Sequence, residues 1–216
     1  MPNVCQTAFK EWAVTIDALA RGEQILLLRK GGIHEPDRHF RVEHDRFLFY
    51  PGYLHQNAAL LKPEYRSRLT AEPDASRAPD ASRAIEKQPD PEFVTFSLYA
   101  EVADVIQLDF QDSSDSPDSE RAAAALEPFH IWAPGFALKR VHWKPRHPLN
   151  VILLRCYSLA EPVSLPVTPE YSGCTSWVDL GRDVPLGKLT PALSDDEFER
   201  RVSDIRNALA STPTAV

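Results

Sequence analysis

The sequence predicts an α+β protein in which a mixed, strongly curved sheet or partial barrel carries flanking helices. Three observations predict this fold class. Helix and strand patterns follow one another without strict β–α alternation, which argues against a doubly wound parallel sheet. Hydrophobic residues make up 43% of the 216 residues, enough for a substantial core. Pro is frequent, at 19 residues, and Gly is scarce, at 8, so stiff and irregular connections are expected.

Helices are predicted most clearly near the two ends of the chain. Apolar residues in 9–20 recur at spacings of three and four, which indicates an amphipathic helix that Gly22 ends. Ser194 and Glu197 have the spacing of a capping box, and an apolar stripe follows them. Weaker patterns predict helices over 58–69, with Pro63 as a kink or a new start, and over 122–129, with Ser119 as the cap.

Strands are predicted from period-two and short aliphatic patterns. Residues 94–102 alternate strictly between apolar and other side chains, which predicts a long strand that runs on towards 108. The segment 149–159 is the most apolar strand candidate and is expected at the centre of the sheet. Shorter strands are predicted over 25–28, 46–50, 163–165 and 177–180, with Pro51-Gly52 ending the second of them.

We expect one domain, formed by 1–69 and 93–210, that a polar insertion interrupts. The insertion, 70–92, contains the sequence PDASRA twice in tandem. Its composition cannot offset the entropy of ordering it, so we expect disorder, with an interdomain linker as the alternative. An acidic loop is expected over 109–120 and a frayed tail over 211–216.

The net charge of −7 is concentrated in the two polar segments. The insertion 70–92 carries six acids and three bases, and 109–120 carries five acids and no base. Setting these aside leaves 20 of the 31 acids and 21 of the 24 bases. The folded body is therefore close to neutral, and an anionic partner such as DNA or RNA is compatible with it.

Several classes of protein are disfavoured by what the sequence lacks. The N-terminus has no apolar signal segment, and the longest aliphatic runs are too short to cross a bilayer, so we expect a cytoplasmic protein without a membrane partner. The three cysteines form no CxxC pair. GxSxG, P-loop and GxGxxG motifs are absent. No cofactor, metal or catalytic residue is predicted, and an enzyme is the less favoured class.

The first candidate site consists of two arginines that follow aliphatic strands. Arg29 and Arg155 each end such a run, and their guanidiniums could bind one phosphate or carboxylate if the strands are neighbours. Lys30 and the Gly31-Gly32 turn adjoin Arg29 and could help to hold an anion. The alternative, favoured on general grounds, is that each arginine pairs with a structural acid such as Glu101.

A second candidate lies in the histidine-rich stretch 34–55. Imidazole and carboxylate side chains can bind metal or move protons, but their spacing here matches no ligand pattern. Solvated loop histidines are the favoured interpretation. His55 and Gln56 rank above the others because they follow a strand and a Pro-Gly turn. A metal-assisted hydrolase would use His34, Glu35, Glu43, His44 and His55.

A third candidate is the basic segment 139–147, which interleaves cations with an aromatic ring. Arg140 and Trp143 suit a nucleic-acid strand, because the charge can meet a phosphate and the ring can stack on a base. Trp132 could add to a stacking pocket. The competing interpretation is a basic surface loop with tryptophans that cover the ends of the sheet.

Five segments of the chain carry a resemblance to a known family: 9–13, 22–33, 46–56, 130–132 and 171–177. Together they resemble the bacterial family known as domain of unknown function 1802 (DUF1802). That family has no established activity. Some relatives are linked to restriction-endonuclease-like domains, which implies work on DNA in restriction or defence and a nuclease partner. Gly22, Gln24 and Arg29 are also similar to the early pattern of PUA-like domains of the ASCH and EVE type, which implies a small curved barrel that binds RNA or modified bases.

Three functions remain open on the sequence alone. The first is a module that binds nucleic acid or a modified base. The second is the metal-assisted nucleic-acid hydrolase, and the third is a protein–protein adaptor of a nuclease. The residues predicted to bind are Arg29, Lys30, His55, Gln56, Trp132, Arg140, Trp143 and Arg155.

Overall fold

A computed structural model describes residues 2–30, 42–53, 56–69, 92–110, 116–143, 147–171 and 175–211. Within these ranges seven strands form one mixed sheet in the order β2-β5-β4-β3-β1-β6, and β7 pairs with β5 beside that path. The sheet is open, with β2 and β6 at its edges. The predicted α+β class with a curved, mixed sheet is confirmed. The strands are β1 (Val4–Trp12), β2 (Leu26–Arg29), β3 (Arg46–Gly52), β4 (Phe93–Leu108), β5 (Leu149–Pro166), β6 (Trp177–Pro185) and β7 (Leu189–Pro191).

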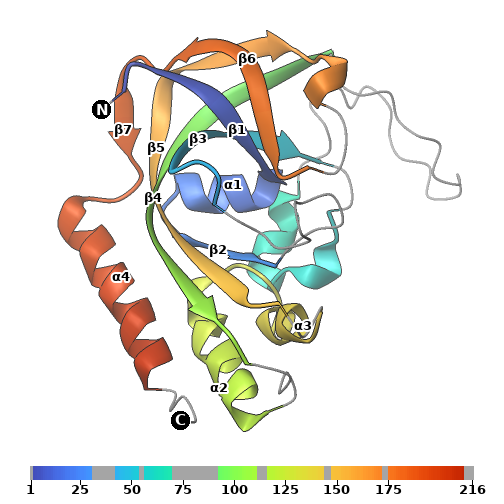
Figure 1. Ribbon diagram of the computed structural model, residues 1–216, viewed down its shortest axis with the longest axis vertical. Helices are drawn as coiled ribbons and strands as arrows, with labels where there is room; N and C mark the ends of the chain where they lie inside the picture. Colours follow the sequence, from blue (N-terminus) through green and yellow to red (C-terminus); the bar gives the residue numbers. More distant parts are fainter. Residues whose placement is uncertain are drawn as a thin grey trace, which may run out of the picture.

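The helices lie inside and around the bend of this sheet (Figure 1). Helix α1 sits within the curve, α2 and α3 close one end of it, and α4 runs along the outside of β4. The α-helices are α1 (Ala13–Ala20), α2 (Pro117–Leu126), α3 (Phe136–His142) and α4 (Asp195–Ala210), and the short 3-10 helices are η2 (Ala58–Leu60), η3 (Pro63–Arg68), η4 (Glu127–Phe129) and η5 (Pro169–Tyr171). No helix in the described ranges combines the length and apolarity that a bilayer crossing requires.

The curvature is carried by the long antiparallel pair β4–β5. Its register shifts twice, between Phe96 and Leu98 and again between Val102 and Asp104. Such irregularities bend a strand and increase its twist. The two faces of the bent sheet each cover a core: the larger lies on the side of α1 and the smaller on the opposite side. The strand predicted over 94–108 is confirmed as β4.

The predicted helix over 9–20 is wrong in its first part, because β1 continues to Trp12 and only then does α1 begin. Strand β1 lies between β3 and β6, with one core on each face. Ala8 packs in the smaller core and Phe9 in the larger. Because both faces of β1 are buried, adjacent residues are apolar and the alternation of apolar and polar residues that marks a half-buried strand is absent. The segment forms a strand, despite its helical spacing, because it pairs with a neighbouring strand on each side.

Other boundaries differ in smaller ways. Strand β3 continues through Pro51 to Gly52, and β5 absorbs the separate strand expected at 163–165. The cap of α2 is Ser116, with Pro117 at the first helical position, whereas Ser119 is buried in the first turn. Helix α3 occupies part of the segment predicted as a basic loop. The insertion 70–91, residues 111–115 and the tail 212–216 lie outside the described residues, so those expectations stay predictions.

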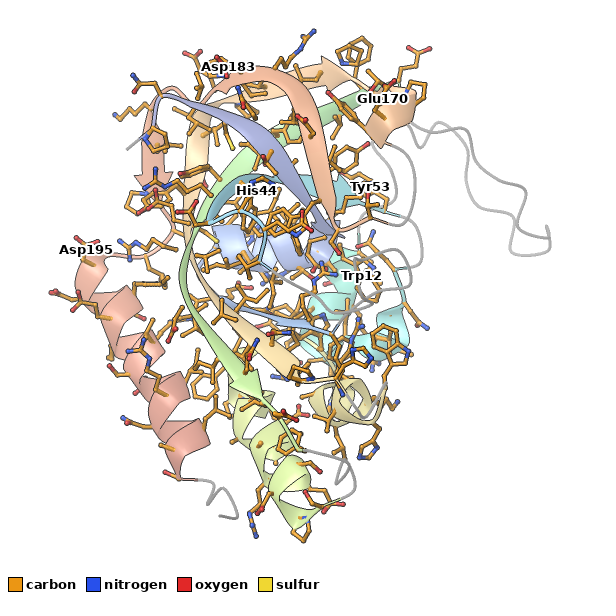
Figure 2. The ribbon with its side chains drawn as sticks, in the orientation of Figure 1. Trp12, His44, Tyr53, Glu170, Asp183 and Asp195 are labelled. Atoms are coloured by element: carbon orange, nitrogen blue, oxygen red, sulfur yellow. The ribbon has the colours of Figure 1, made fainter. Side chains whose placement is uncertain are left out.

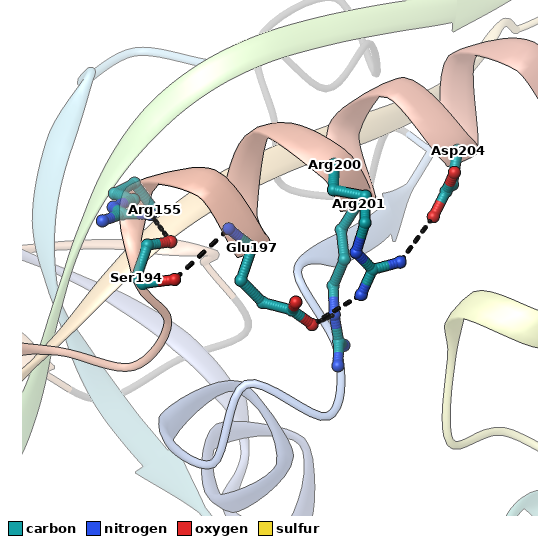
Figure 3. Close-up of polar contacts among 6 residues, drawn as sticks. All are labelled: Arg155, Ser194, Glu197, Arg200, Arg201 and Asp204. Carbon is teal, nitrogen blue, oxygen red and sulfur yellow. Dashed lines mark hydrogen bonds and ion pairs between the residues drawn. The ribbon is translucent and has the colours of Figure 1, made fainter.

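The predicted cap of the last helix is confirmed. The Ser194 hydroxyl accepts a hydrogen bond from the Glu197 amide at 3.3 Å, and the Glu197 carboxylate pairs with Arg200 and Arg201 further along α4 (Figure 3). Because an N-cap hydroxyl satisfies a helix amide that otherwise lacks a partner, Ser194→Ala is expected to lower the free energy of unfolding by about 1 kcal/mol.

Urea unfolding measures this loss. Ser203→Ala is the matched control, because Ser203 is exposed in the middle of the same helix and alanine is the better helix former there. Equal effects of the two substitutions would contradict a capping role for Ser194.

Candidate functional site

A cavity of about 330 Å³ opens where β1, β2 and β3 end beside α3. Strands β1 and β3 are parallel and pair Trp12 with Gly52, so their last residues reach the same edge. Trp12 marks this place in Figure 2. We call the cavity the cleft. It is lined by Lys10, Glu11, Trp12, Leu28, Arg29, Gly52, Trp132, Phe136, Arg140, Thr175 and Ser176.

Arg29 reaches from β2 across the opening of the sheet to β1. Its Nη2 atom donates to the Glu11 carboxylate at 2.7 Å and to the Lys10 carbonyl at 2.9 Å. The guanidinium carbon lies 4.5 Å from the centre of the Phe9 ring. The other Glu11 oxygen accepts from the Trp12 amide at 2.8 Å. Glu11 and Arg29 therefore form a fixed ion pair in the wall of the cleft.

Arg140 brings a second guanidinium to the same cleft from α3. It lies 5.1 Å from the Phe136 ring centre and 6.0 Å from that of Trp143. Among the described residues it makes no hydrogen bond or ion pair. Burial lowers the pKa of Arg140 from its ordinary value, the charge of Arg29 lowers it further, and Glu11 acts in the opposite direction. Arg140 is thus a half-buried cation without a protein acceptor in the described part of the chain.

Lys10 contributes its backbone to the cleft but directs its ammonium elsewhere. The Nζ atom donates to the Tyr171 carbonyl at 2.5 Å and lies 5.6 Å from the Tyr50 ring centre. Both tyrosines belong to the smaller core or pack against it, on the opposite face of the sheet. In the part of the chain that the structure describes, the side-chain charges that line the cleft are therefore those of Arg29, Glu11 and Arg140.

Aromatic rings form one wall of the cleft. Trp132 is 3% exposed and stacks on Phe136, with the ring centres 4.7 Å apart and an interplanar angle of 17°. Trp132 also pairs with Leu61 through a β-bridge. The His130 ring lies behind this stack, 5.2 Å from Trp132. The wall is consequently rigid and apolar.

Two predicted binding residues have structural partners. Lys30 is buried and its ammonium donates to the Val141 carbonyl near the end of α3. Burial lowers the pKa of Lys30 to about 8, although the negative charge of Asp109 acts to raise it. Gln56 accepts from the Val14 amide at 3.4 Å, at the start of α1. Neither side chain lines the cleft.

Arg155 does not join Arg29, so the hypothesis that the two share one anion is wrong. The favoured alternative, in which each arginine pairs with an acid, is confirmed, although the acids are Glu11 and Asp195 rather than Glu101. Strands β2 and β5 are neighbours but antiparallel, and Arg29 pairs with Asn150 rather than with a residue near Arg155. Arg155 instead donates to the Ser194 carbonyl at 3.1 Å (Figure 3). It also forms an ion pair with Asp195. Figure 2 shows Asp195 on the opposite side of the molecule from Trp12.

Of the remaining predicted residues, Trp132 lines the cleft, and Trp143 lies beside Arg140 with 41% of its surface exposed. His34, Glu35 and His55 lie outside the described residues. Glu43 and His44 are exposed. In the described ranges no three His, Cys, Asp or Glu side chains are grouped so that they could hold a metal ion.

Sequence reasoning missed Glu11, Trp12, Phe136, Thr175 and Ser176, all of which line the cleft. The helical spacing concealed the first two, because it places Glu11 on the polar face of the predicted helix and Trp12 on the apolar face.

The fold and the cleft define an α+β protein with an open, curved sheet and a basic–aromatic cavity at the strand ends. The sequence model of the family described as "Domain of unknown function (DUF1802)" matches residues 8–204. The chain belongs to this family, and every residue that lines the cleft falls within the match.

One solved structure is similar in part: a point mutant of the ASCH protein of Zymomonas mobilis. It shares 13% sequence identity, with 94% of this chain and 98% of that chain covered and a TM-score of 0.34. A TM-score this low transfers no property to the present chain. No curated protein matches the sequence. Nothing in these comparisons supports the nuclease partner that the sequence resemblance implied.

Proposed function

We propose that the chain binds nucleic acid, and that the cleft receives one part of a single strand. Arg140 carries the proposal: it is a half-buried cation that no described residue pairs with, placed in the wall of an aromatic cavity. A buried charge without a partner is costly. A phosphate oxygen is the kind of acceptor that a guanidinium fork matches.

The aromatic side chains supply the second requirement of strand binding. Trp12 lines the cleft and Trp143 lies exposed beside Arg140. Indole rings stack on bases of any sequence, and each stacked base contributes about 1–3 kcal/mol. The arrangement therefore supports binding through one phosphate and its neighbouring bases, without a row of base-specific hydrogen bonds. Lys30, Gln56 and Arg155 have no direct part in this proposal, because their partners are within the fold.

Arg140→Gln is expected to weaken the binding of a labelled single-stranded oligonucleotide by about 10- to 100-fold, because it removes one charge-assisted contact. The logarithmic salt dependence of binding should also become shallower by about 0.7, the contribution of one phosphate contact on a single strand. Fluorescence anisotropy between about 50 and 200 mM salt measures both quantities.

The matched control is Arg182→Gln. Arg182 is exposed on β6, next to Asp183, which Figure 2 shows at the far end of the molecule from Trp12. This substitution makes the same change in net charge and is expected to leave affinity nearly unchanged. No binding of DNA or RNA at any salt concentration, or equal effects of the two substitutions, would refute the proposed function.

A further inference from the structure

Among the described residues, the side chains that line the cleft leave a single positive charge for the ligand. Arg29 and Glu11 compensate one another through their 2.7 Å contact, and Arg140 remains. The ammonium of Lys10 is bound on the opposite face of the sheet. Thr175 and Ser176 also line the cleft, and neither residue adds charge to it.

Glu11 cannot easily leave the cleft. Its side chain is 11% exposed, and both carboxylate oxygens accept hydrogen bonds, one from Arg29 and the other from the Trp12 amide. Releasing the carboxylate would leave the Arg29 guanidinium, whose side chain is 23% exposed, without its acidic partner. The negative charge is therefore a fixed feature of the wall rather than a mobile surface charge.

A phosphodiester and a terminal phosphate monoester differ in what they demand of such a cleft. The diester carries one negative charge, whereas a monoester carries about 1.5 to 2 at neutral pH. A cleft with one uncompensated positive charge neutralises the diester. The monoester would keep an excess negative charge in a confined space beside the carboxylate, where water cannot screen it fully.

We propose that the cleft selects a phosphodiester over a terminal phosphate monoester, and that Glu11 is the specificity-determining residue. This inference rests on the proposed function, since it names the part of the nucleic acid that the cleft accepts. The ligand is accordingly a phosphate within a chain rather than a phosphorylated end.

The experiment compares two small competitors that differ by one methyl group and one charge: thymidine 5′-monophosphate and its methyl phosphodiester. Each displaces a labelled oligonucleotide from the full-length protein, and the displacement is followed by fluorescence anisotropy. For the unmodified protein, the methyl diester is expected to compete about tenfold better than the monoester, because the monoester brings one more charge towards Glu11.

A series of variants separates charge from shape. Glu11→Gln raises the side-chain charge of the cleft from one to two, so it should bind both competitors more tightly and lose the preference for the diester. Arg29→Gln lowers that charge to zero and should weaken both. The double variant restores a charge of one and should recover the preference. Circular dichroism and thermal unfolding establish that each variant is folded.

The outcomes distinguish the two proposals. Failure of the labelled oligonucleotide to bind would refute the proposed function itself. If the oligonucleotide binds and the two competitors displace it equally, or neither displaces it, the selectivity is absent and the inference is overturned. A preference that persists unchanged in folded Glu11→Gln would also overturn it, because the carboxylate would then have no part in the selection.

Discussion

Trp132→Ala is expected to lower the free energy of unfolding by about 3–5 kcal/mol, the usual cost of truncating a buried tryptophan. The Trp132 side chain is 3% exposed and stacks on Phe136. It also packs within the larger core and against the His130 ring. Its loss would leave a void directly behind the cleft, so Phe136 and the Arg140 that lies over it would lose their support. Chemical denaturation measures the cost.

Two further variants make this prediction specific. Trp132→Phe retains an aromatic ring at the position and should recover much of the lost stability. Trp143→Ala removes an indole of the same size that is 41% exposed, and is expected to cost no more than about 1 kcal/mol. Similar losses for Trp132→Ala and Trp143→Ala would show that the wall of the cleft does not depend on the stacked pair.

The parts of the fold that could be predicted are those that local patterns specify. Strand β4 alternates from Phe93 to Leu98 because one of its faces is buried there and the other is exposed. The Ser194 cap depends on a spacing of three residues and on nothing beyond α4. Helix α3 was not predicted, because its packing against the end of β2 depends on contacts of Lys30, a residue more than one hundred positions away from Val141.

The candidate site shows the limit of such reasoning more clearly. Arg29 and Arg155 end similar aliphatic runs, and their sequence context does not distinguish them. The antiparallel pairing of β2 with β5 places them at opposite ends of the short β2–β5 ladder, one beside Glu11 and the other beside Asp195. Strand direction and register are global properties that a single sequence does not reveal.

The structure nevertheless joins parts of two independent sequence hypotheses. The strand-end guanidinium of Arg29 and Arg140 of the basic–aromatic segment 139–147 meet at one cavity. They meet because β2 is short and ends beside α3. The ammonium of Lys30, the residue after β2, donates a hydrogen bond to the Val141 carbonyl near the end of that helix. The cleft thus depends on Lys30, a buried lysine that was predicted to bind a ligand and instead donates a hydrogen bond to α3.

Acidification from pH 6.5 to 4 is expected to lower the free energy of unfolding by about 3 kcal/mol through His130. His130 is 3% exposed, and neither ring nitrogen has a hydrogen-bond partner among the described residues. Burial, followed by the nearby Lys62 charge, lowers the pKa of His130 from 6.5 to about 4. The unfolded chain therefore binds a proton at a higher pH than the folded protein, so stability is complete above pH 6.5 and declines as the pH falls.

Urea unfolding across this pH range, with the wild type compared to His130→Leu, isolates the contribution of the buried imidazole. The variant removes the titrating group, so its stability relative to the wild type should rise by about 3 kcal/mol between pH 7 and pH 4. His142→Gln is the control, because His142 is exposed at the end of α3, and it should follow the wild-type curve closely. A constant difference between His130→Leu and the wild type across this range would mean that His130 titrates at the same pH in the folded and unfolded states. The His130 ring, which packs against Trp132 in the wall of the cleft, would then be accessible to water rather than buried.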